Sequence, residues 1–268
     1  MAHTSVAPAH FAEGDFRVGR VIRRSASMLS RHFLTFFIVS VVAHAPIILL
    51  ARTLTTEPTD LLLLVLAWQV LGLLQLIVLG TLGEAVIVHA AFQDMQRRPV
   101  RLAESLNVAL RRFLPIVGLA FVVGLLIELV VVFGFVVVSS IQQEYLPLVG
   151  LILLMIPGLI LYAMWFVAVP ACVVERLGPW TSLRRSRDLT KGHRWKLCGL
   201  ALLLIIPSLF DITFGLATAA GPIVGLIINW FCSGIWAAFA AVVGVVTYHD
   251  LRVVKEGIHI DQIAGVFD

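Results

Sequence analysis

Long apolar runs dominate the chain, and basic loops separate them. Several runs continue for about 20 residues with few charges, which is the length that a helix needs to cross the hydrocarbon core of a bilayer. In the whole sequence 60% of the residues are hydrophobic and 13% are charged, whereas an average soluble protein has about 25% charged residues. The pattern predicts an all-α integral membrane protein and excludes a soluble domain.

The runs predict six transmembrane helices, which we expect to form three hairpins within one membrane domain over residues 15–257. Residues 1–14 are expected to be disordered and residues 258–268 to form a cytoplasmic tail. Pro157 and Pro207 should kink the fourth and fifth helices, because proline removes a helix hydrogen bond. We place the six helices at residues 33–53, 61–91, 113–139, 146–173, 197–218 and 222–248.

A basic amphipathic segment precedes each expected hairpin. In residues 16–32 the apolar side chains recur at helical spacing with arginines opposite them, a pattern typical of helices that lie in the membrane interface. A solvated helix that packs on other loops is the alternative. Residues 105–113 and 186–195 repeat the arrangement, and each segment ends near an aromatic residue. The fold class is therefore six transmembrane helices in three hairpins, each preceded by a basic interfacial helix.

The distribution of basic residues predicts the orientation. Nineteen of the twenty Lys and Arg residues fall in segments that a six-helix arrangement places on one side, and only Arg52 falls on the other. Cytoplasmic loops carry an excess of Lys and Arg, so both termini are expected in the cytoplasm. Because the arginines adjoin apolar helices, their charge indicates anionic headgroups as partners and not nucleic acid.

Several polar residues fall inside the expected spans. Charged groups at this depth are costly and are candidates for function. Phe113 lies roughly 22 Å from Glu128 and Trp195 lies roughly 24 Å from Asp211, at a helical rise of 1.5 Å per residue. The candidate polar layer comprises His44, Glu128, Asp211 and Asn229, and Glu84 is a third carboxylate within a span. Either these groups form a pathway across the bundle, or they only hydrogen-bond between helices.

Catalytic and metal-binding patterns are missing from the sequence. It contains no HExxH, GxSxG, P-loop or GxGxxG motif, and the histidines are dispersed. The three cysteines are isolated, without the spacing of a zinc site. We therefore expect no enzyme activity, no cofactor and no metal.

The polar loop at residues 170–196 carries a recognisable motif. Residues 157–162 precede it with the sequence PGLILY, and residues 248–257 follow the last run with YHDLRVVKEG. The order and spacing of these segments resemble the membrane domain of bacterial glycerophosphoryl diester phosphodiesterases and its stand-alone relatives of unknown function. The motif residues are Pro170, Glu175, Gly178, Ser186, Leu189, Thr190, Gly192 and Trp195, with Asp250 and Arg252 in the last segment.

The resemblance covers essentially the whole chain. It implies a multi-pass protein of the bacterial cytoplasmic (inner) membrane with six transmembrane helices. It does not imply phosphodiesterase activity, because in fused members that chemistry belongs to a separate soluble barrel.

The motif residues are expected to build a structural turn. Pro179 suits the first position of a short helix, Gly178 the turn before it, and Gly192 a left-handed position that ends it. Glu175 should pair with Arg184, Arg185 or Arg187, and Asp250 with Arg252 or another cytoplasmic arginine. A lipid phosphate is the alternative partner, and its candidate contacts are Arg184, Arg185, Arg187 and Arg194.

Two functions follow as hypotheses. The first is a non-enzymatic inner-membrane protein that contacts anionic lipids and organises the membrane or binds another membrane protein. The second is a small transporter or lipid translocator that uses the intramembrane polar layer. The sequence does not indicate the oligomeric state.

Overall fold

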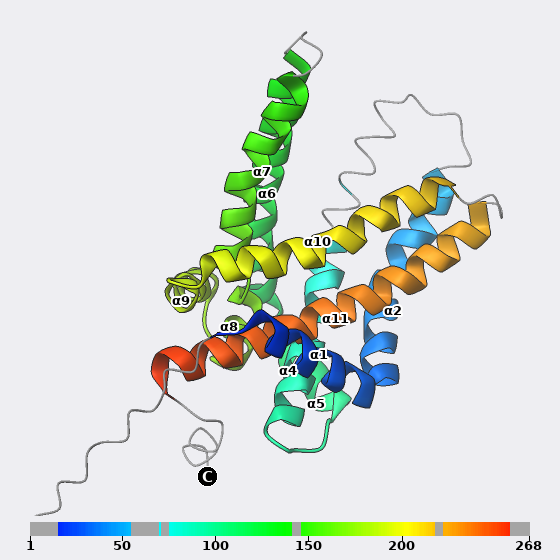
Figure 1. Cartoon of the computed structure of the whole chain (residues 1–268). Helices are drawn as coiled ribbons and strands as arrows, with labels where there is room; N and C mark the ends of the chain where they lie inside the picture. The colour runs from blue at the N-terminus through cyan, green and yellow to red at the C-terminus, as the bar shows by residue number, and fades with distance from the viewer. Residues whose placement is uncertain (1–15, 55–69, 71–74, 141–145, 218–221, 258–268) are drawn as a thin grey trace, which may run out of the picture.

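The computed structural model describes residues 16–54, 70, 75–140, 146–217 and 222–257 (Figure 1), and every regular element in these ranges is helical. The all-α prediction is therefore confirmed for this part of the chain. The elements are α1 (Val18–Arg31), α2 (Phe33–Leu54), the π-helix η1 (Gln75–Gly80), α4 (Thr81–Met95), α5 (Leu102–Arg111), α6 (Phe113–Ser140), α7 (Leu146–Trp165), α8 (Ala168–Val174), α9 (Pro179–Thr190), α10 (Arg194–Ala217) and α11 (Pro222–Glu256).

Several helices could cross a membrane. Among the described residues, the stretches Ile77–Met95, Ile156–Val174 and Ile227–Glu256 are long and apolar enough to do so. The number rises to as many as five if each of two bent pairs counts as one span. These pairs are α1 with the first part of α2, bent by 91°, and α5 with the first part of α6, bent by 69°.

Three short helices come directly before long apolar ones, namely α1 before α2, α5 before α6 and α9 before α10. Each short helix buries a small set of side chains at helical spacing and exposes its basic residues, except that Arg185 of α9 is half-buried. In α1 the buried residues are Val21, Ser25 and Met28, and in α5 they are Ser105 and Ala109. The segments expected at residues 16–32 and 105–113 thus correspond to α1 and α5. The third, at residues 186–195, covers only the end of α9, the turn after it and the start of α10.

The expected fourth span is interrupted. We predicted one helix over residues 146–173, but α7 ends at Trp165 and α8 begins at Ala168. Helix α7 continues through Pro157, so the interruption lies one helical turn or more beyond the proline that was expected to kink it. The break leaves a backbone carbonyl of α7 available to side chains of α9.

Helix α11 lies at the centre of the described fold, in contact with α1, α2, α4 and α10 (Figure 1). Small residues permit close approach to α2. A Cβ atom on Gly83 would lie 2.8 Å from Ala43 Cβ, and one on Gly234 would lie 2.7 Å from Val41 Cγ2. Interfaces between membrane helices are enriched in such small residues, because they let the backbones approach.

Tryptophan side chains add hydrogen bonds between these helices. Trp230 Nε1 donates to Val41 O at 3.0 Å, and Trp236 Nε1 donates to Leu204 O at 2.8 Å. Both residues belong to α11, while the two acceptors belong to α2 and α10. Helix α11 is therefore held to its neighbours by polar contacts as well as by packing.

Candidate functional site

Glu175, which follows α8 directly, is the centre of a charged network. Arg185 Nε in α9 donates to both of its carboxylate oxygens, at 2.9 and 3.0 Å. The hydroxyl group of Tyr248 in α11 donates to Glu175 Oε1 at 2.6 Å. One carboxylate thus joins three helices, and its arginine partner is one of the three that we expected.

The network continues to the end of α11. Glu256 accepts from Arg185 Nη2 at 2.5 Å and from Arg252 Nε at 3.0 Å, and Arg252 Nη1 donates to the Tyr248 hydroxyl at 3.2 Å. Burial by itself would lower the pKa of Arg185, but its hydrogen bonds and attraction to Glu175 and Glu256 outweigh burial and raise the pKa. The two arginines and two glutamates balance in charge, which favours a structural role.

Asp250 connects α11 to the first helix. It accepts a 2.7 Å hydrogen bond from Arg24 Nη1 in α1 and lies 3.3 Å from His249 Nδ1. We expected Arg252 or another arginine of the basic segments, and the partner in the structure is Arg24. The contact positions α1 along α11, as Figure 1 shows.

Ser186 in α9 binds a carbonyl group at the break between α7 and α8. Its hydroxyl group donates to Met164 O at 2.9 Å, and the Thr190 hydroxyl donates to the same oxygen at 3.3 Å. Both side chains are fully buried. A buried carbonyl without a partner is costly, so these two motif residues compensate for the interruption of the helix.

The ends of α9 agree with the predicted turn at two positions and differ at a third. Pro179 is the first helical residue, and Gly192 has a φ of +90° after the helix. The left-handed residue before α9, however, is Arg176 with a φ of 56°, whereas Gly178 is extended. Gly178 therefore does not supply the turn; an arginine adopts the strained conformation instead.

Two further motif residues lie at opposite extremes of burial. Pro170 is buried in α8, where it is 3.7 Å from the position of a Cβ on Gly244 of α11. Trp195, at the start of α10, is 82% exposed. An exposed tryptophan at the start of an apolar helix fits an interfacial position.

The four arginines proposed as lipid contacts differ in their surroundings. Arg184 and Arg187 are exposed on α9, and Arg194 is half-buried at the start of α10. Arg185 is bound to two carboxylates. Arg184 and Arg187 are the two of this set whose side chains are turned outwards.

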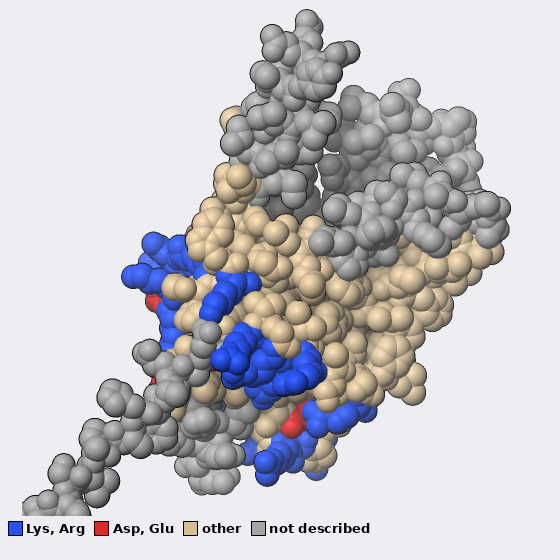
Figure 2. All heavy atoms as spheres, viewed as in Figure 1, with Lys and Arg blue, Asp and Glu red and all other residues tan. Residues whose placement is uncertain are grey.

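A second group of arginines lines a groove between α1 and the end of α4. The groove has a volume of about 500 Å³ and includes Arg23, Arg24, Arg31 and Arg97 with one acidic residue, Asp94. Asp94 accepts from Arg31 at 2.8 Å and contacts His32 Nε2 at 2.9 Å. Figure 2 shows Lys and Arg side chains gathered on one part of the face in view, while the described surface beyond them is formed by other residues.

Two members of the predicted polar layer can be placed. Asn229 accepts a 3.4 Å hydrogen bond from Ser233 within α11. His44 Nδ1 in α2 lies 2.7 Å from Ser40 O. The side chains of Glu128 and Asp211 lie outside the described residues, so the layer as a whole stays a prediction.

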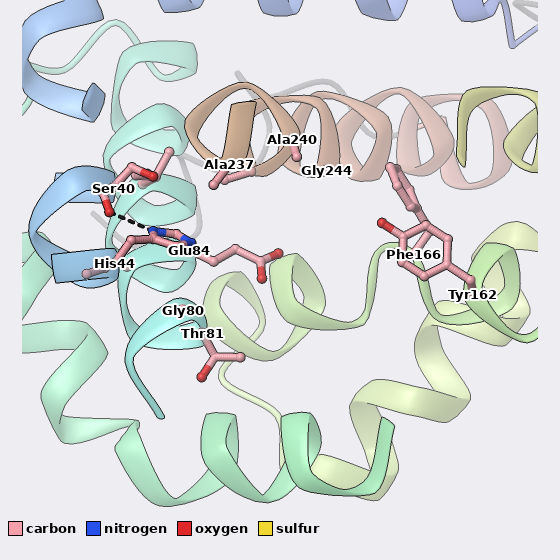
Figure 3. Close-up of a pocket in the computed structure, with 14 residues that line it drawn as sticks. Ser40, His44, Gly80, Thr81, Glu84, Tyr162, Phe166, Ala237, Ala240 and Gly244 are labelled. Atoms are coloured by element: carbon pink, nitrogen blue, oxygen red, sulfur yellow. Dashed lines mark hydrogen bonds between the residues drawn. The ribbon is translucent and has the colours of Figure 1, made fainter. Parts of the chain in front are cut away.

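His44 instead lines a cavity with a different carboxylate, that of Glu84. The cavity has a volume of about 210 Å³ and is formed by α2, the junction of η1 and α4, α7 and α11. Figure 3 shows the Glu84 carboxylate extending between the His44 ring on one side and Tyr162 and Phe166 on the other. Sequence reasoning noted Glu84 as an intramembrane carboxylate but did not place it beside His44.

Comparisons with known proteins identify no relative. A scan against protein-family models, a search of curated proteins and a search of solved structures each found no match. The resemblance to the phosphodiesterase membrane domain therefore stays a prediction. Within the described residues, no group of three or more His, Cys, Asp or Glu side chains is arranged to hold a metal ion.

Proposed function

We propose that the chain is a six-span protein of the bacterial inner membrane, built from three hairpins, with both termini in the cytoplasm. The surface of α6 supports this proposal, because its exposed residues include a row of large apolar side chains: Leu114, Phe121, Leu125, Leu129 and Phe133. The concentration of basic residues in α1, α5, α9 and the adjoining loops supports the cytoplasmic orientation.

We propose that its function is to bind anionic phospholipids through the arginine-lined groove between α1 and the end of α4, which we call the basic face, as a membrane organiser or as the partner of another membrane protein. The groove between α1 and α4 carries this proposal. Arg24 and Arg31 are paired with Asp250 and Asp94, whereas Arg23 and Arg97 are exposed and, within the described residues, have no carboxylate partner. Guanidinium groups in this state suit the oxygens of a phosphate.

The test is native mass spectrometry of the detergent-solubilised protein, titrated with phosphatidylglycerol or phosphatidylcholine. Each basic residue near an anionic surface contributes about 1 kcal/mol, so the double variant R23Q/R97Q should weaken phosphatidylglycerol binding by about 30-fold. The matched control is R101Q/R111Q, which removes two exposed charges of α5 outside the groove. Equal binding of both lipids by the wild-type protein, or equal losses in the two variants, would contradict the proposal.

The absence of enzyme activity is also part of this proposal. It is supported by the missing catalytic motifs and by the resemblance, in which phosphodiester hydrolysis belongs to a separate domain. Incubation of the purified protein with a glycerophosphodiester should release no alcohol above the uncatalysed rate. Release that depends on the protein would overturn this part.

Transport is a second candidate function, and the cavity that contains His44 and Glu84 favours it. Under this alternative, the uptake of a solute into proteoliposomes is coupled to proton flow. This uptake should be lost in Glu84→Gln while the protein remains folded. The same loss is expected for Glu128→Gln or Asp211→Asn if the predicted layer is part of the pathway. Unchanged uptake in all three variants would contradict transport.

A further inference from the structure

The cavity around Glu84 presents hydrogen-bond acceptors to its interior. His44 Nδ1 contacts the carbonyl oxygen of Ser40, and a carbonyl can only accept, so the proton of a neutral ring must be on Nδ1. The Nε2 atom is then an acceptor. Together with the carboxylate of Glu84, it gives the cavity two acceptors on neighbouring elements.

Thr81 also lines the cavity, but its hydroxyl group is directed to the backbone of η1 and away from Glu84 (Figure 3). The hydroxyl donates to Ile77 O at 2.5 Å, with a second contact to Val78 O at 3.4 Å. Thr81 lies at the junction of the π-helix and α4, and π-helical segments occur frequently at functional sites.

Glu84 itself has no hydrogen bond or ion pair within the described part of the chain. A carboxylate in the apolar part of a membrane protein is costly unless it is paired or protonated. The nearby His44 Nε2 is an acceptor as well and cannot pair with the carboxylate. Tyr162 can donate, but one phenol cannot satisfy the two oxygens of an ionised carboxylate.

The remaining walls would suit the apolar part of a small cation. Tyr162 and Phe166 lie edge to face with ring centroids 5.7 Å apart and form an apolar wall. Between this wall and His44, α11 presents small residues, including Ala237, Ala240 and Gly244, which leave the space open (Figure 3).

We propose that this cavity binds a small organic ammonium ion, with the ammonium group between Glu84 and His44 Nε2 and its carbon chain against Tyr162 and Phe166. An ammonium group has three donors and no acceptor, which matches an acceptor-rich lining. The cavity volume of about 210 Å³ accommodates a short alkylammonium ion. This inference does not depend on lipid binding at the basic face.

Isothermal titration calorimetry of the detergent-solubilised full chain with propylammonium chloride tests the proposal, with propanol and sodium chloride as ligand controls. The wild-type protein should bind propylammonium and neither control. Charge-assisted hydrogen bonds contribute enough that Glu84→Gln should weaken binding at least about tenfold. Phe166→Ala removes part of the apolar wall beside the carbon chain and should weaken binding by about tenfold through the lost apolar contact. Glu104→Gln, an exposed substitution on α5, should bind as the wild type does.

Ala240→Leu provides an independent test, because it fills the cavity and leaves the carboxylate in place. Binding should be lost in this variant even if Glu84→Gln does not fold. Wild-type protein that binds no propylammonium, or binds propanol equally well, would overturn the proposal. Wild-type affinity in Glu84→Gln or in Ala240→Leu would overturn it too, and would leave Glu84 as a protonated structural carboxyl group.

Discussion

The hydroxyl group of Tyr248 donates a 2.6 Å hydrogen bond to Glu175 Oε1, although the two residues are 73 positions apart in the chain. Tyr248 is fully buried, and the contact joins the C-terminal part of α11 to the loop between α8 and α9. The same carboxylate is bound by Arg185. The three residues thus connect the short helices α8 and α9 to α11, the central helix of the fold.

Loss of the charge on Glu175 should destabilise the protein more than loss of the Tyr248 hydroxyl. Glu175→Gln removes negative charge beside the partly buried Arg185 and Arg252, and it should lower the free energy of unfolding by about 1–3 kcal/mol. Tyr248→Phe removes a single hydrogen bond and should cost about 1 kcal/mol. Thermal unfolding in detergent measures both, with the exposed Glu104→Gln as control. A smaller loss in Glu175→Gln than in Tyr248→Phe would contradict the charged network.

Ser186→Ala should also destabilise the protein, by about 1–3 kcal/mol, because Met164 O would lose its 2.9 Å hydrogen bond inside the fold. Thr190 contacts the same oxygen at 3.3 Å and would compensate in part. Thr181→Ala is the matched control, since Thr181 is exposed on the same helix. Equal unfolding temperatures for the two variants would show that the break after α7 does not need the serine.

The sequence predicted helices well because their signals are local. Apolar length and amphipathic spacing depend only on neighbouring residues, so α1, α5 and α9 and most helix ends were found within a few residues. The interruption between α7 and α8 was missed because no proline or glycine occupies residues 166–167. It is compatible with the fold because side chains of α9 bind the freed carbonyl of Met164, which is a tertiary contact.

In the candidate site, too, the contacts between helices could not be predicted from local sequence signals. Charge complementarity predicted partners for Glu175 and Asp250, but several arginines were equally suitable by sequence. Depth along a helix can be estimated from residue number, yet the direction of a side chain around the helix depends on packing. Depth alone therefore did not indicate that His44 lines one cavity with Glu84. Its grouping with Glu128 and Asp211 stays a prediction, because the side chains of those two residues lie outside the described part of the chain.

Alanine substitutions at two glycines should have opposite effects on stability. In Gly234→Ala the new Cβ would lie 2.7 Å from Val41 Cγ2 and 3.6 Å from Val41 Cα, so overpacking should cost about 1–3 kcal/mol. Around Gly199 no heavy atom lies within 4 Å of the new Cβ. Gly199→Ala in α10 should then stabilise the protein by up to about 1 kcal/mol through helix propensity.

Unfolding curves of both glycine variants in the same detergent provide the measurement. Gly83→Ala is a second overpacking variant, because its Cβ would lie 2.8 Å from Ala43 Cβ. It should behave as Gly234→Ala does. Destabilisation by Gly199→Ala of the same size would show that the effect comes from glycine itself and not from the contact with α2.

The proposed topology predicts the side from which introduced cysteines react. Arg97 and Arg187 belong to segments that six spans place in the cytoplasm, whereas Glu57 and Glu144 belong to segments on the other side. In a Cys232→Ser background, where the remaining Cys172 and Cys198 are buried, a membrane-impermeant maleimide should label Arg97→Cys and Arg187→Cys almost only in inside-out vesicles. Glu57→Cys and Glu144→Cys should react in right-side-out vesicles. The physical reason is that basic segments are retained on the cytoplasmic side during insertion.

Detergent-permeabilised vesicles are the control for reactivity, since all four variants should then be labelled. Reaction of Arg97→Cys and Arg187→Cys from opposite sides would require an odd number of spans between them and would contradict the proposed arrangement.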